Sequence, residues 1–93
     1  MKAVGIFTHG APDVLRVIDV PEVHAGPGQV RIRVHAATVN PTDIAVRDGA
    51  RAAQQKIDPP PYVPGMEVAG IIDEVGAGVA DRLKAGDRVI GIV

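Results

Sequence analysis

The 93-residue sequence contains no cysteine, and this absence removes several kinds of chemistry at once. Without thiols the chain cannot form a disulfide, use a thiolate nucleophile or bind zinc through cysteine. A chain without cysteine also suits a reducing compartment, so the sequence predicts a cytoplasmic protein.

The sequence also lacks an excess of charge of one sign. It has 10 Lys and Arg against 11 Asp and Glu, a formal net charge of −1, and its basic residues are spread along the chain. Such a distribution offers no electrostatic footprint for a nucleic acid or an anionic membrane. Neither partner is therefore expected.

Long apolar runs are missing too. The opening residues MKAVGIFTHGAPD lack the apolar core of a signal peptide. No run approaches the roughly 20 residues that a membrane-spanning helix needs. What remains predicts one soluble intracellular domain, because a chain of this length supports a single modest core.

Short apolar segments separated by turn-forming residues predict a mainly β (α+β) fold. The clearest strand alternates apolar and polar residues in VRIRVH, residues 30–35, which directs Val34 toward the core and His35 toward solvent. Further strands are expected at Ala3–Phe7, Val14–Val20, Glu67–Val75 and Arg88–Val93. Five short strands at close spacing indicate a barrel or a sandwich.

One short helix is predicted at NPTDIAVRDG, Asn40–Gly49. Asn40 is a favourable N-cap, and Pro41 suits the first helical position. Asp43 complements the helix dipole, and Gly49 can end the helix.

A long excursion separates this helix from the next strand. Ala50–Ile57 has a helix-forming composition without a firm amphipathic pattern, and DPPPYVPG, Asp58–Gly65, is expected to be an extended loop. Its tetrapeptide Pro59–Tyr62 matches the PPxY pattern that WW domains bind. A stiff loop leading into the next strand is the favoured interpretation.

Three motifs agree in order and spacing: VNPTD at Val39–Asp43, PGMEVAGIIDEVGAGV at Pro64–Val79, and GDRVIG at Gly86–Gly91. Together with the opening MKAV they resemble the N-terminal GroES-like catalytic domain of the medium-chain dehydrogenase/reductase superfamily. Within it, the zinc-independent NADPH:quinone oxidoreductases and related enoyl reductases look most similar. The resemblance covers essentially the whole chain.

The resemblance implies a GroES-like, partly open β-barrel with one or two short helices. Residues 1–93 would be the N-terminal GroES-like catalytic domain, incomplete at its C-terminal end. In this superfamily the cofactor lies mainly on a separate Rossmann domain, which is absent from this chain. The chain alone is therefore expected to be inactive, and the full-length protein to form a homodimer.

The resemblance also bears on zinc. Asn40 stands where the zinc-dependent alcohol dehydrogenases carry a cysteine ligand, and Met66 stands where they carry a histidine ligand. An amide is a poor zinc donor, and a thioether prefers softer metals. The three histidines, His9, His24 and His35, show no ligand spacing and are expected at the surface, so no metal site is predicted.

Without metal, the resemblance implies hydride transfer from NADPH to a quinone or an α,β-unsaturated carbonyl compound. Asn40 matches an asparagine beside the nicotinamide, so Asn40, Pro41 and Thr42 are the expected cofactor contacts. Asn40 and Thr42 are the catalytic candidates. Thr42 occupies the position of a proton-relay hydroxyl, although a hydroxyl bonded to the backbone of the helix start is an equal alternative. Ala45 replaces a tyrosine found in many quinone reductases.

Three residues are expected to support the site: Asp43, Arg47 and Glu67. Asp43 would act at the helix start. Glu67 lies between Met66 and Val68 in an apolar run, where a charge needs a partner. It could be a catalytic base, but the favoured interpretation is a structural carboxylate held by backbone amides or by an arginine such as Arg47.

The segment GAGVAD, Gly76–Asp81, has a G-x-G pattern without the third glycine of a dinucleotide fingerprint. It predicts a β-turn rather than a phosphate cradle. Two alternatives to the reductase remain. One is an alcohol dehydrogenase-like member that has lost zinc, and the other is a GroES-like co-chaperonin or interaction module without enzymatic activity.

Overall fold

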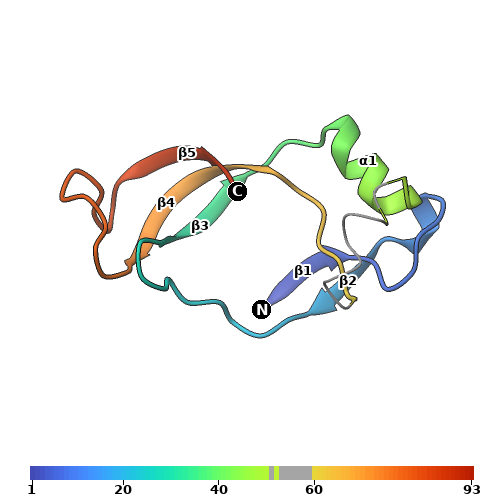
Figure 1. The fold of residues 1–93 in the computed structure, drawn as a ribbon, viewed down its shortest axis with the longest axis horizontal. Helices are drawn as coiled ribbons and strands as arrows, with labels where there is room; N and C mark the ends of the chain where they lie inside the picture. Colours follow the sequence, from blue (N-terminus) through green and yellow to red (C-terminus); the bar gives the residue numbers. More distant parts are fainter. Residues whose placement is uncertain (51, 53–59) are drawn as a thin grey trace. The chain divides into compact units, whose positions relative to one another are not determined.

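The computed structural model describes residues 1–50, 52 and 60–93. Contacts divide the chain into two compact units, shown with their elements in Figure 1. Unit 1 comprises Met1–Pro21 and Val39–Gly65, and unit 2 comprises Glu22–Thr38 and Met66–Val93. Most of the expected segment Ala50–Ile57 and the first two residues of Asp58–Gly65 lie outside the described residues.

Unit 1 contains an antiparallel pair of strands, β1 (Lys2–Gly5) and β2 (Arg16–Asp19). Both are shorter than predicted. Strand β1 ends at Gly5, and Ile6 instead exchanges two backbone hydrogen bonds of 2.9 Å with Tyr62. Strand β2 starts late because the short 3-10 helix η1 (Pro12–Val14) occupies its predicted beginning. Ile6, fully buried, forms the centre of a small core.

The predicted helix is present as α1 (Pro41–Asp48). The backbone of Asn40 is extended at the N-cap, Pro41 is the first helical residue, and Gly49 ends the helix with φ of 94°. A positive φ of this size favours glycine, which has no Cβ. The predicted end of the helix at Gly49 is therefore confirmed.

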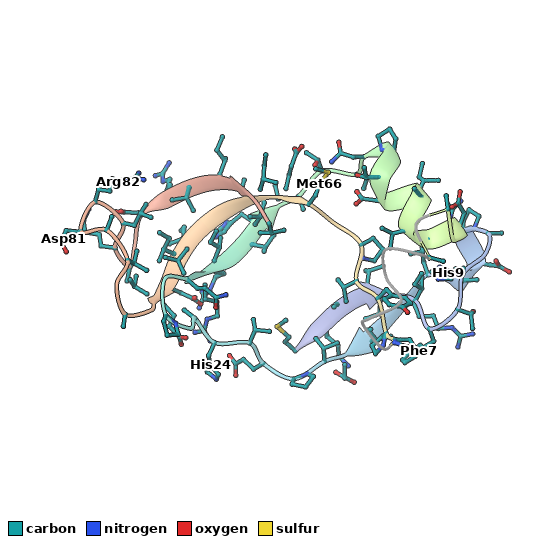
Figure 2. All side chains as sticks on the ribbon, in the orientation of Figure 1. Phe7, His9, His24, Met66, Asp81 and Arg82 are labelled. Atoms are coloured by element: carbon teal, nitrogen blue, oxygen red, sulfur yellow. The ribbon has the colours of Figure 1, made fainter. Side chains whose placement is uncertain are left out.

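The C-terminal end of α1 is capped by another part of unit 1. The ring nitrogen Nδ1 of His9 donates to the Val46 carbonyl at 3.0 Å, and the Gly10 N–H donates to the Arg47 carbonyl at 2.9 Å. The last carbonyls of a helix have no partner inside it, so these two bonds complete the final turn. Figure 2 shows His9 beside α1.

Unit 2 is built on an antiparallel sheet of β3 (Val30–Ala36), β4 (Glu67–Val75) and β5 (Arg88–Ile92), with β4 in the middle. Strand β4 has its predicted bounds. Strand β5 ends one residue early, although the Val93 N–H still donates to the Met66 carbonyl at 2.8 Å. The mainly β class is confirmed, and the described strands form two partial, open sheets.

Two bulges interrupt the pairing of β3 with β4. Asp73 is the extra residue on β4, and His35 is the extra residue on β3. Ile72 and Val68 form the buried face of the sheet, but Val34 is 58% exposed. The prediction that Val34 reaches the core is wrong, because its cross-strand partner Gly70 has no side chain to pack against it.

Candidate functional site

The residues expected to contact the cofactor, Asn40–Thr42, form one continuous stretch at the N-terminal end of α1. Asn40 and Thr42 are half-buried, and Pro41 between them is exposed. The Asp43 carboxylate accepts a hydrogen bond of 2.8 Å from the Asn40 backbone N–H, and the Asp43 N–H donates to the Asn40 carbonyl at 2.9 Å. Asp43 thus fixes the backbone from which Asn40 and Thr42 project.

Arg47 and Glu67 each make a hydrogen bond within their own unit. The Arg47 guanidinium donates through Nε to the Gly10 carbonyl at 3.2 Å. Glu67 accepts a hydrogen bond of 3.0 Å from the Thr38 hydroxyl. Arg47 and Glu67 lie in different units, and each of these two bonds is made within one unit, so the predicted pairing of Glu67 with Arg47 stays a prediction.

Unit 2 has a groove of about 460 Å³ on its sheet, within the size range of small-ligand sites. Its lining is mostly apolar, and Thr38 and Glu67 supply polar groups. The lining includes Ala36, Ala69, Ile90 and Ile92.

A cluster of charged side chains around Arg31 in unit 2 was not predicted from the sequence. Arg31 is one of the polar residues in the alternation of residues 30–35, a pattern that directs it toward solvent, yet its side chain is only 23% exposed. Its Nε lies 2.8 Å from Asp73 Oδ1, and its Nη1 lies 3.5 Å from Glu74 and 3.6 Å from Glu22. The partners on β4 are distant in sequence, and only the register of β3 on β4 brings them to Arg31.

His24 joins this cluster from the segment that leads into β3 (Figure 2). Its Nδ1 lies 3.1 Å from Glu74 Oε2. The hydrogen bond from His24, with that from the Ala25 N–H and the charge of Arg31, lowers the pKa of Glu74 below its ordinary value. The cluster thereby fastens the segment around His24 and Ala25 to β4.

We expect this cluster to make stability depend on acid pH. A carboxylate whose pKa is lowered on folding adds stability above its unfolded pKa, about 4.3, and loses it as pH falls through the lower folded value. Glu74→Gln should therefore flatten the decline in the urea midpoint between about pH 5 and pH 3. Asp81→Asn serves as the control, because exposed Asp81 has no hydrogen bond or ion pair within the described ranges. An equal decline in Glu74→Gln and wild type would contradict the prediction.

None of the three histidines, all within the described residues, lies in a group that could hold a metal ion. His9 is half-buried, contrary to the surface position expected, and its ring stacks on Tyr62 at 5.5 Å between centroids. His24 contacts Glu74, and His35 is exposed on β3. Across residues 1–50, 52 and 60–93 no group of three or more His, Cys, Asp or Glu is arranged to hold a metal ion.

The segment GAGVAD forms the predicted turn, at Ala77–Gly78. The Gly76 N–H donates to the Gln29 carbonyl at 2.8 Å, and the Ala77 carbonyl accepts from Gly28 at 2.7 Å. A Cβ at Gly76 would collide with the Gly26 carbonyl. Glycine is required here for close packing of two backbones, and the Gly76 amide is not available to a phosphate.

Tyr62 does not suit a WW-domain ligand. Its backbone is paired with Ile6, and its half-buried ring stacks on His9. The end of the proline-rich segment is thus paired with Ile6, the residue that follows β1.

No helix among the described residues is long and apolar enough to cross a bilayer.

The two partial sheets, the capped helix and the motifs along them define a GroES-like domain of the dehydrogenase type. The alcohol dehydrogenase GroES-like domain family matches residues 26–92, and the chain belongs to this family, within the medium-chain dehydrogenase/reductase superfamily. The resemblance predicted from the sequence motifs is confirmed.

Within this superfamily, the chain is similar to quinone oxidoreductases. The chain is 42% identical to the quinone oxidoreductase of Rattus norvegicus over 94 residues, covering 96% of this chain and 26% of that protein. The Coxiella burnetii quinone oxidoreductase structure matches with a TM-score of 0.90 at 35% identity, covering 99% of this chain and 29% of the other. The chain therefore spans about a quarter of the length of these quinone oxidoreductases.

Two further similar structures are of proteins described with a nicotinamide cofactor. The Escherichia coli quinone oxidoreductase complexed with NADPH matches at 31% identity and a TM-score of 0.76, covering 97% of this chain and 25% of the other. An NAD-dependent alcohol dehydrogenase matches at 39% identity and a TM-score of 0.83, covering 97% of this chain and 25% of the other.

Proposed function

We propose that the chain is the substrate-side domain of a zinc-independent oxidoreductase that reduces quinones or α,β-unsaturated carbonyl compounds with NADPH. The observation that carries this proposal is the similarity to quinone oxidoreductases over nearly the whole chain. Because the chain spans only about a quarter of those proteins, turnover requires the rest of the polypeptide. A cytoplasmic location and a homodimeric assembly belong to the same proposal.

The start of α1 supplies the groups for this chemistry. When bound, NADPH supplies a hydride to the polarised double bond of the substrate. Asn40, Pro41 and Thr42 would contact the cofactor, and the Thr42 hydroxyl would pass a proton to the oxygen of the reduced substrate, since a hydroxyl both donates and accepts. Asp43 holds this turn in place through the Asn40 N–H.

The donor chemistry of the chain does not fit a catalytic zinc site. Asn40 and Met66, at the positions of two zinc ligands, offer an amide and a thioether, which are poor partners for zinc. The similarity to an NAD-dependent alcohol dehydrogenase nevertheless supports a second candidate, an alcohol dehydrogenase-like enzyme that has lost zinc. The two candidates differ in their substrates and in their cofactor preference.

Kinetics and metal analysis of the purified full-length protein test the proposal. We expect oxidation of NADPH with quinones or enones, faster than with NADH, and far less than one zinc per chain. The 93-residue chain alone should show no turnover. Oxidation of alcohols with NAD⁺ and no quinone reduction would favour the second candidate, and stoichiometric zinc would overturn the metal-free mechanism.

A further inference from the structure

The hydrogen bond between Thr38 and Glu67 links two strand ends in unit 2. Thr38 lies two residues beyond the end of β3, and Glu67 is the first residue of β4. The hydroxyl of Thr38 donates to Glu67 Oε2 at 3.0 Å. An ionised carboxylate only accepts hydrogen bonds, so the direction of this bond is fixed, and a charged acceptor strengthens it.

The position of this bond along the chain is informative. Thr38 is the last residue of unit 2 before the chain passes to unit 1, and Met66, next to Glu67, is the first residue after it returns. Figure 2 shows Met66 where the chain enters β4. Within unit 2, the bond therefore joins the residue where the chain leaves the unit to the residue that follows its return.

Neighbouring bonds make the Glu67 end of this link rigid. Glu67 is half-buried and pairs with Ile92 in the β4–β5 ladder. The Val93 N–H donates to the Met66 carbonyl at 2.8 Å, which extends that ladder by one residue. The Thr38 end continues directly into Asn40, which is two residues further along the chain.

We propose that Glu67 is a positioning residue that acts through Thr38. The carboxylate holds the Thr38 hydroxyl, and Thr38 fixes the chain that leads into Asn40 and Thr42. This inference rests on the proposed function, because it assigns Glu67 to anchoring the chain segment that precedes the cofactor-contacting turn. Neither group is required to touch the substrate.

Four substitutions in the full-length enzyme separate the hydrogen bond from side-chain volume. Thr38→Val removes the hydroxyl at nearly constant volume, and Thr38→Ser keeps it. Glu67→Leu removes the acceptor, and Glu67→Gln keeps one oxygen. We expect Thr38→Val and Glu67→Leu to lower kcat about tenfold with KM for NADPH within about twofold, because orientation rather than binding is lost. Thr38→Ser and Glu67→Gln should stay close to wild type.

The double variant and a matched control sharpen the test. If one bond carries the effect, Thr38→Val combined with Glu67→Leu should lower kcat no further than either change alone. Thr8→Val is the control, since Thr8 is exposed and has no hydrogen bond in the described part of the chain. Its kcat should equal that of wild type.

Hydrogen exchange gives a readout that does not depend on turnover. In the full-length protein without ligand, the backbone amides of residues 38–43 should exchange faster in Thr38→Val than in Thr38→Ser or Thr8→Val. If the wild type reduces no quinone or enone, the proposed function fails while this comparison still tests the link. Unchanged exchange in Thr38→Val, or a kcat for Thr38→Val equal to that of Thr38→Ser, would overturn the proposal. Should Glu67→Leu fail to fold, Thr38→Val carries the test alone.

Discussion

Gly70→Ala is expected to destabilise the protein by about 3 kcal/mol, the upper end of the usual cost of overpacking. Gly70 lies in β4, the central strand of the unit 2 sheet, opposite Val34. A Cβ at this position would lie well inside 3.0 Å of the Arg33 backbone carbonyl. Backbone atoms of a paired strand cannot swing aside as a side chain can, so β3 must shift or its pairing with β4 must break.

Gly91→Ala is the matched control for this prediction. Gly91 lies in the neighbouring strand β5, and a Cβ there has no other atom within 4 Å. Replacing this glycine should leave stability unchanged or raise it by about 0.5 kcal/mol, because the unfolded chain loses conformational freedom. Urea unfolding of both variants provides the measurement. Equal stability of Gly70→Ala and Gly91→Ala would show that β3 does not approach β4 as closely as described.

The elements of this fold were predictable where one residue type decides the local structure. Pro41 can begin a helix and Gly49 can end it, so α1 has its predicted bounds within a residue. The bounds of β4 follow from a mainly apolar segment, interrupted by Asp73 and Glu74, between turn signals. Alternation predicted β3 as a strand, but it could not locate the bulges at His35 and Asp73, which depend on the partner strand.

The candidate site was predictable to a different extent. Asn40, Pro41 and Thr42 were named from a short motif whose residues are contiguous, and their roles stay predictions. The hydrogen bond from Thr38 to Glu67 was not predicted, because the two residues are 29 positions apart. A single sequence carries no signal for a hydrogen bond across a strand pair of unknown register. The cluster around Arg31 was missed for the same reason.

The largest expected loss of activity belongs to Thr42→Val in the full-length enzyme. If the Thr42 hydroxyl passes the proton, kcat should fall about 100-fold, the lower end of the usual contribution of general acid–base catalysis. Valine has nearly the same shape as threonine and the same branching at Cβ, so the first turn of α1 should keep its geometry. Steady-state kinetics with NADPH and a quinone measure the effect, and Thr42→Ser should recover most of the rate.

The alternative role of Thr42 leads to a different pair of results. A hydroxyl that only bonds the backbone of the helix start would cost about 1 kcal/mol of stability when removed, with little change in rate. Thermal unfolding of Thr42→Val, compared with the exposed Thr8→Val, therefore distinguishes the two roles. A lower melting temperature with kcat within about twofold of wild type would remove Thr42 from the proton path. Unchanged stability with a 100-fold slower reaction would instead establish the hydroxyl as a catalytic group.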